Sequence, residues 1–211
     1  MYQPPHFRED RLEVQHALIR AHPLGLLVTH GGTGLIANPI PFVLDATASP
    51  HGTLRAHLSR ANPQWRDFDP DQEALVVFHG TETYITPSWY EAKREHGKVV
   101  PTWNYAIVQA YGRMRVTDDS DWLQKQITAM TSAQESTRAE PWAVSDAPAD
   151  FVAAQLKGIV GVEIEITRIE GKWKVSQNRS EADRRSVAMG LRILGDEDAR
   201  QMADLVDERG A

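Results

Sequence analysis

The sequence contains no cysteine among its 211 residues. A disulfide framework and a thiolate metal site are therefore both excluded. No apolar run approaches the roughly 20 residues that a transmembrane helix needs; the longest runs, such as residues 74–78, suit a strand. The first ten residues, MYQPPHFRED, lack the cationic start and apolar core of a signal peptide. We therefore expect a cytoplasmic protein without a membrane span.

An excess of positive charge is also missing. The formal net charge is -6 and the sequence pI is about 5.7. Proteins that bind nucleic acids generally present a basic surface, because contacts to phosphate carry much of their affinity. The most basic stretches, at residues 93–98, 172–174 and 184–185, are short and separated. Direct DNA binding is therefore doubtful, and a small-molecule ligand is the better expectation.

Common catalytic motifs are absent as well. The sequence has no GxSxG, HExxH, GxxxxGK[ST] or GxGxxG pattern. The eight histidines are scattered, and none stands at metal-ligand spacing from a second ligand. We expect no metal site, and the motifs identify no catalytic residue.

The hydrophobic pattern predicts many short strands with helices between and after them. Strands are expected at residues 24–30, 34–45, 53–59, 74–79, 83–86 and 104–116, and at 159–176 as two strands joined at Glu170-Gly171. Helices are expected at residues 11–21, 118–134, 180–191 and 197–206. Pro39 and Pro41 favour a sheet edge or a split in the sheet, because proline cannot donate to a ladder. The pattern predicts a single α+β domain over residues 1–211, built on a mainly antiparallel barrel, with C-terminal helices from about residue 180.

Residues 55–65, RAHLSRANPQW, are the first chemical lead. The polar face of the strand presents a guanidinium, an imidazole and a hydroxyl, and Arg60 follows. Asn62-Pro63 then has the pattern of a helix N-cap and first helical residue. Cationic groups beside free backbone N–H groups suit a phosphate. A solvated strand face followed by an ordinary capped turn explains the same spacing equally well.

Aromatic residues gather in residues 84–90, YITPSWY, and 100–105, VPTWNY. Aromatic rings with a few polar groups among them suit a flat heteroaromatic ligand. A barrel core or a dimer interface is the alternative, and aromatic content alone favours it.

The third lead is residues 171–179, GKWKVSQNR. Lys172, Lys174 and Ser176 alternate with apolar residues, so one strand face is cationic, and Gln177 adds an amide at the strand end. The alternative is an exposed edge strand whose lysines discourage strand addition.

Six strings in this order, ANPIPF, HLSRANPQW, YITPSWY, KVVPTWNY, PWAVSDAP and EGKWKVSQNR, resemble the PaiB family, described as FMN-binding negative transcriptional regulators. The resemblance implies a flavin split barrel like that of pyridoxamine phosphate oxidase, with FMN between the subunits of a homodimer. It implies flavin contacts for Ala37, Asn38, His57, Leu58, Ser59, Arg60, Asn62, Thr102, Trp103, Asn104 and Gln177. Within that set the phosphate maps to His57, Ser59, Arg60 and Asn62, the isoalloxazine to residues 37–38, and the closing side of the pocket to residues 102–104. The family often has histidine where this chain has Pro39.

Two functions from different classes follow from the resemblance. One is an FMN-binding negative transcriptional regulator, with the flavin as ligand or sensor. The other is an FMN-dependent oxidoreductase acting on a small molecule, and a split barrel supports both. Haem binding is a third and weaker alternative, because a related split-barrel group handles haem.

Overall fold

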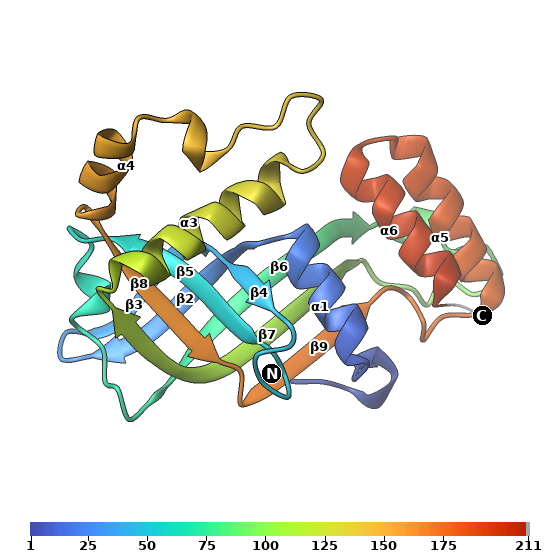
Figure 1. The fold of residues 1–211 in the computed structure, drawn as a ribbon. Helices are drawn as coiled ribbons and strands as arrows, with labels where there is room; N and C mark the ends of the chain where they lie inside the picture. The colour runs from blue at the N-terminus through green and yellow to red at the C-terminus, as the bar shows by residue number, and fades with distance from the viewer. Residues whose placement is uncertain (210–211) are drawn as a thin grey trace. The chain divides into compact units, whose positions relative to one another are not determined.

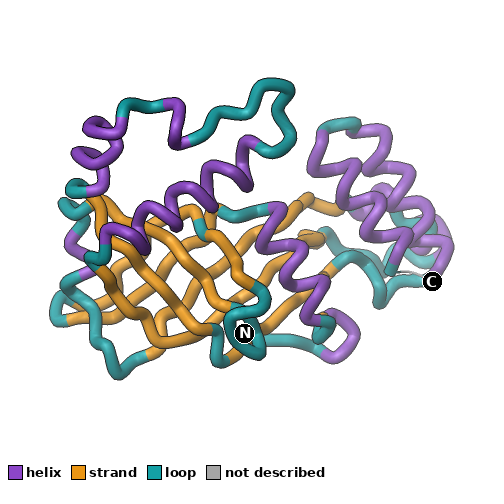
Figure 2. Tube along the Cα trace, viewed as in Figure 1, coloured by secondary structure: helices purple, strands orange, loops and turns teal. Residues whose placement is uncertain are grey.

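The computed structural model describes residues 1–209 (Figures 1 and 2). Its strands form a nine-stranded antiparallel sheet. The strand order is β3-β2-β6-β7-β8-β5-β4, and β9 pairs with β7 and β1. The strands are β1 (Arg8–Glu9), β2 (Leu24–Gly31), β3 (Gly34–Pro41), β4 (Val43–Asp45), β5 (Thr53–Ser59), β6 (Glu73–Ile85), β7 (Thr102–Thr117), β8 (Ile159–Glu165) and β9 (Arg168–Lys174). The helices are α1 (Leu12–Ala21), α2 (Ala92–Glu95), α3 (Ser120–Glu135), α4 (Ala149–Leu156), α5 (Glu181–Leu194) and α6 (Glu197–Glu208). This architecture confirms the predicted α+β antiparallel class.

The chain forms two compact units. Unit 1 comprises Met1–Leu18, His79–Val108 and Glu170–Ala211, and unit 2 comprises Ile19–Phe78 and Gln109–Ile169. Strands β6 and β7 contribute residues to both, so no single cut of the chain separates the units. That the chain folds as a single domain stays a prediction.

In unit 2, α3 packs on strands β5 and β8 (Figure 1). Leu54, Ala56 and Leu58 of β5 are buried, as their alternation predicts. Gly161 of β8 allows the close approach of α3, because a Cβ there would come within 2.4 Å of the Trp122 ring. The helix begins at an Asp119 N-cap, whose side chain accepts from the Trp122 N–H at 2.7 Å.

The β2–β3 hairpin forms one edge of the sheet, which confirms the position predicted from Pro39 and Pro41. Leu27 faces the core of unit 2, yet the opposite face of the hairpin is also apolar and lies open to solvent. Side chains of residues paired across β2 and β3 point to the same side of the sheet. We call the apolar part of this surface the hairpin face; it comprises Leu24, Leu26, Val28, Leu35, Ala37, Pro39 and Pro41, and His30, the partner of Leu35, lies on the same side.

Unit 1 contains the α5–α6 hairpin, which covers a short 3-10 helix at Pro87–Trp89. The contact requires Gly190 in α5, because a Cβ there would meet the Trp89 ring at 2.5 Å. Ser180 caps the start of α5. Gly195 ends the helix with φ of 74°, in the left-handed region that glycine adopts without strain.

Three element predictions are wrong in detail. Residues 34–45 form two strands, because the chain leaves the β3 ladder after Pro41. Residues 74–79 and 83–86 belong to one strand, β6, in which Gly80 serves close packing: a Cβ there would lie 3.0 Å from Leu18 and 3.3 Å from the Ala106 carbonyl oxygen. The β8–β9 connection lies at Ile166-Thr167, so Glu170-Gly171 is inside β9.

Neither a helix suited to crossing a bilayer nor a cluster of metal-ligating side chains occurs within residues 1–209.

Candidate functional site

The turn after β5 is anchored to strands β2 and β3 by Gln64, which is fully buried. Its Nε2 donates to the Leu27 carbonyl at 3.1 Å, to Thr29 Oγ1 at 3.2 Å and to the Ile36 carbonyl at 3.3 Å. Its Oε1 accepts from Asn38 Nδ2 at 3.0 Å. Unit 2 therefore brings Asn38 beside the turn that carries Arg60 and Asn62, which are far from it in sequence.

Asn62 is the N-cap of the short 3-10 helix Pro63–Trp65, as the sequence predicts. Its Oδ1 accepts from the Gln64 N–H at 3.0 Å, so that N–H already has an intramolecular partner. Ser59 Oγ accepts from the Ala61 N–H at 3.3 Å, and Ser59 itself is exposed. The turn thus leaves a hydroxyl at the surface beside a rigid capped helix start.

Arg60 is not a free cation. Its Nη2 lies 2.6 Å from Asp118 Oδ1 and 2.9 Å from the Ile159 carbonyl, and its Nε donates to the Lys157 carbonyl at 3.1 Å. The neighbouring Arg66 takes part in no ion pair found within residues 1–209 and lies over the Trp65 ring, 4.2 Å from its centroid. Sequence reasoning missed Arg66 as the less neutralised guanidinium at this turn.

His57 and Leu58 differ in whether their side chains can contact a ligand. Leu58 is 2% exposed, so its side chain belongs to the core. His57 lies on the other face of β5, and its Nδ1 is buried without a partner. Burial lowers the pKa of His57 from its ordinary value, which favours the neutral imidazole. His57 therefore supplies a neutral hydrogen-bonding group and no positive charge.

Ala37 lies on the exposed side of β3, in the middle of the hairpin face, opposite Val28. Leu26 and Pro39 form the next pair along the hairpin. The aliphatic and proline side chains at these four positions form an apolar surface. A planar aromatic ligand can lie on such a surface.

In unit 1, Thr102, Trp103 and Asn104 begin strand β7. Asn104 is buried, and its Nδ2 donates to Ser176 Oγ at 3.0 Å. Trp103 is 53% exposed and packs edge to face with Tyr84, with ring centroids 6.0 Å apart. The structure therefore brings two of the aromatic segments singled out from the sequence into contact.

Gln177 follows β9 in a tight local turn. Its Nε2 donates to the Trp173 carbonyl at 2.6 Å, and its Oε1 accepts from the Val175 N–H at 2.8 Å. Ser176 inside this turn has φ of 68°, which is unusual for a residue other than glycine. The hydrogen bond from Asn104 to Ser176 connects this turn to the start of β7.

Cations gather at the same end of β9. Lys174 Nζ donates to Thr102 Oγ1 at 2.5 Å and to the Trp103 carbonyl. Both lysines of the strand adjoin the Tyr105 ring, with Nζ to centroid distances of 5.3 Å for Lys172 and 6.0 Å for Lys174. Burial, followed by the charges of Lys172 and Arg179, lowers the pKa of Lys174. We call Lys172, Lys174 and Arg179 the β9 cation cluster.

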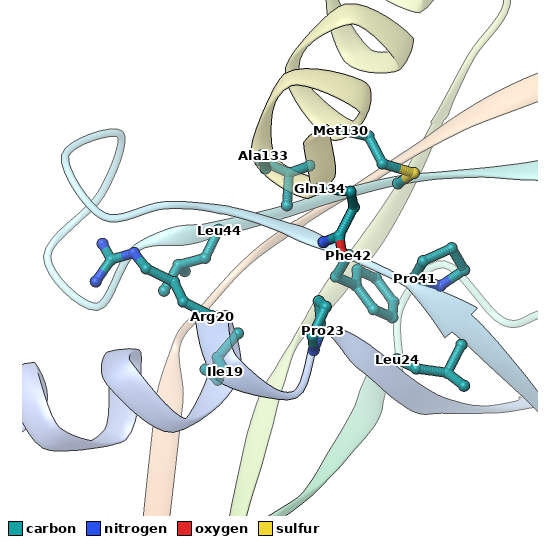
Figure 3. Close-up of a pocket in the computed structure, with 11 residues that line it drawn as sticks. Ile19, Arg20, Pro23, Leu24, Pro41, Phe42, Leu44, Met130, Ala133 and Gln134 are labelled. Atoms are coloured by element: carbon teal, nitrogen blue, oxygen red, sulfur yellow. The ribbon is translucent and has the colours of Figure 1, made fainter. Parts of the chain in front are cut away.

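A separate groove with a volume of about 640 Å³ lies in unit 2, where the end of α1, the start of β2, β4 and α3 meet (Figure 3). Phe42, Leu44, Pro23 and Met130 give it a largely apolar lining. None of the residues implied by the family resemblance lines it. The groove therefore does not coincide with the expected flavin contacts.

Comparisons with known proteins identify the family. The family model described as "Putative FMN-binding domain" matches residues 1–168. An uncharacterized protein of Emericella nidulans is 37% identical, over 100% of this chain and 98% of its own length. "Protease synthase and sporulation protein PAI 2" of Bacillus subtilis is 32% identical, over 99% of this chain and 98% of its own length.

Among solved structures, the flavocytochrome Anf3 from Azotobacter vinelandii superposes with a TM-score of 0.57 at 12% identity. The superposition covers 79% of this chain and 69% of the flavocytochrome, and at this identity it shows the fold alone. Together with the family model it supports a flavin split barrel. The chain belongs to the PaiB family of FMN-binding split-barrel proteins.

Proposed function

We propose that the protein binds FMN as a homodimer and acts as a negative regulator of transcription, with the flavin as its ligand or sensor. The observation that carries flavin binding is the edge strand β3: the turn anchored by Gln64 lies against its Asn38 side, and the hairpin face lies on its Ala37 side. This arrangement places a flat apolar surface and a polar turn on neighbouring elements of unit 2.

The residues present fit the two parts of FMN. Ala37, with Leu26 and Val28 of the neighbouring strand, suits one face of the isoalloxazine. Ser59 and Arg60, with Arg66, suit the phosphate, because a hydroxyl and guanidinium groups are donors that phosphate accepts well. Asn38 and Asn62 hold this turn in place through Gln64. When bound, the flavin would supply redox chemistry or a redox signal.

The homodimer is supported by the exposure of the hairpin face. Leu24, Leu26 and Leu35 are 63%, 40% and 77% exposed, so the solvent-facing side of the hairpin is largely apolar. Contiguous apolar surface of this kind marks an interaction site. We infer that a second copy covers it, because a self-complementary twofold interface is the common solution for soluble proteins. Thr102, Trp103, Asn104 and Gln177 would then complete each flavin site from the partner.

The regulatory role is supported by the name of the Bacillus subtilis relative, which refers to protease synthesis and sporulation. The net charge of -6 argues that regulation does not depend on direct DNA binding by this chain alone. A flavin-linked signal to a partner protein fits the net negative charge better. An FMN-dependent oxidoreductase remains the second candidate, favoured by Lys174, a cation beside Thr102 that suits an acidic substrate.

Replacing Ser59 by Ala and Arg60 by Gln together is expected to weaken FMN at least tenfold while riboflavin affinity changes little. Only FMN carries the phosphate, and the loss of a charge-assisted contact costs about 1.5–3 kcal/mol. Fluorescence titration of both flavins into apo protein measures the two dissociation constants. An equal loss for both flavins would mean that the phosphate lies elsewhere.

Asp118→Asn is the matched control, because it breaks the same ion pair and keeps the guanidinium of Arg60. We expect it to bind FMN as tightly as the unaltered protein or more tightly. If it weakens FMN as strongly as the double variant, the effect comes from loosening the turn and a direct phosphate contact is refuted.

A further inference from the structure

The β9 cation cluster is unusual because no ion pair neutralises its charges in the part of the chain that the structure describes. Lys172 is 8% exposed, and Lys174 and Arg179 are half-buried. The ion pairs found within residues 1–209 include none of the three. Surrounding groups are instead aromatic rings: Tyr105 beside both lysines, Tyr2 at 5.5 Å from Lys172 Nζ, and Tyr90 at 4.7 Å from Arg179 Cζ.

Positive charges gathered at a partly buried site oppose each other and lose hydration. Cation–π contacts recover part of that cost, and the hydrogen bonds of Lys174 to Thr102 and Trp103 recover more. Neither supplies negative charge. The arrangement is therefore complete only when an anion joins it, because an anion relieves the repulsion and accepts several charge-assisted hydrogen bonds at once.

The alternative interpretation, that these lysines only protect an exposed edge strand from strand addition, does not explain the cluster. Lysines that protect an edge strand point into water, whereas Lys172 is buried and β9 pairs with both β1 and β7. The cluster also contacts Thr102 and Trp103 directly through Lys174. It therefore belongs to the part of unit 1 that carries the aromatic segments.

We propose that Lys172, Lys174 and Arg179 form an anion-binding site for a phosphate or carboxylate group of a small molecule. Two sources share this chemistry: an acidic substrate or effector, and the phosphate of the flavin itself. In the second case the inference rests on the proposed function and moves the phosphate site from the Ser59–Arg60 turn to β9. In the first case the protein binds a second small molecule, an acidic one, in addition to the flavin.

The test is calorimetric titration of inorganic phosphate into the full-length, flavin-free protein. We expect saturable binding that Lys174→Gln weakens at least about tenfold, the loss of one charge-assisted contact. Lys125→Gln, on the exposed side of α3, is the control and should bind phosphate like the unaltered protein. Lys174→Arg keeps the charge and should recover most of the affinity, which shows that loss in Lys174→Gln is not a folding defect.

Titration of the same variants with FMN and riboflavin identifies the source. If Lys174→Gln weakens FMN tenfold more than riboflavin, the anion is the flavin phosphate. If phosphate binding falls while the ratio of FMN to riboflavin affinity stays constant, the site serves a separate acidic ligand. If the unaltered protein binds no phosphate at millimolar concentration and Lys174→Gln leaves both flavin affinities unchanged, the proposal is wrong. Because the phosphate titration uses no flavin, it tests the anion site even if the protein does not bind FMN.

Discussion

Replacing Gln64 by Leu is expected to lower the free energy of unfolding by about 3 kcal/mol. The substitution removes the amide that donates to Leu27, Thr29 and Ile36 and leaves the Asn38 amide without its acceptor. Each buried polar group left without a partner costs about 1–3 kcal/mol. Chemical denaturation followed by circular dichroism measures the loss, which corresponds to a fall in Tm of about 6–12 °C for a chain of this size.

The same substitution tests how the site is assembled. Since Gln64 joins the turn after β5 to β2 and β3, its loss should also weaken FMN under conditions where the protein is still folded. Gln201→Leu, on the exposed surface of α6, is the control and should change stability by less than about 0.5 kcal/mol. A Gln64→Leu protein as stable as this control would contradict the role given to the buried amide.

Replacing Leu26 by Glu is expected to convert the dimer to a monomer at micromolar concentration. The substitution places a carboxylate in the centre of the hairpin face, and a twofold interface would bury it twice. An unpaired buried charge costs several kcal/mol, so the dimer dissociation constant should rise by about two orders of magnitude or more. Sedimentation velocity across a concentration series measures the change.

Met189→Glu provides the comparison, because Met189 is 61% exposed on α5 in unit 1 and should leave the dimer intact. Flavin affinity should fall in Leu26→Glu, because Leu26 lines the proposed isoalloxazine surface and because the partner completes the site, and it should stay unchanged in Met189→Glu. If Leu26→Glu stays dimeric, the hairpin face is not the interface. The aromatic segments between Tyr84 and Tyr105, which the sequence also favours for this role, would then be the next candidates.

Local chemistry made much of the fold predictable. The alternation in β5 and the missing donors of Pro39 and Pro41 depend on neighbouring residues only, and the structure agrees with both. The Asn62 N-cap is equally local. The same reasoning fails where a glycine is needed for close packing. Gly80 and Gly171 are typical turn residues in the sequence, yet both lie inside strands.

The charge state of the site depends on tertiary contacts and was not predictable. Arg60 has the position of a free phosphate donor in the sequence, but Asp118 neutralises it from a loop after β7. In contrast, Lys172 has the pattern of an exposed edge lysine and is buried. Gln64 gave no signal at all, because its importance lies in bonds to three separate backbone or side-chain groups on other strands.

The central claim is that the protein binds FMN, and the most direct measurement is a titration of the flavin-free, full-length protein with FMN. Visible absorption and flavin fluorescence would be followed together. We expect saturation at one FMN per chain, a shift of the flavin absorption bands as the ring leaves water, and tighter binding of FMN than of riboflavin. Absorption bands that stay those of free flavin, with no saturation at micromolar protein, would contradict the account.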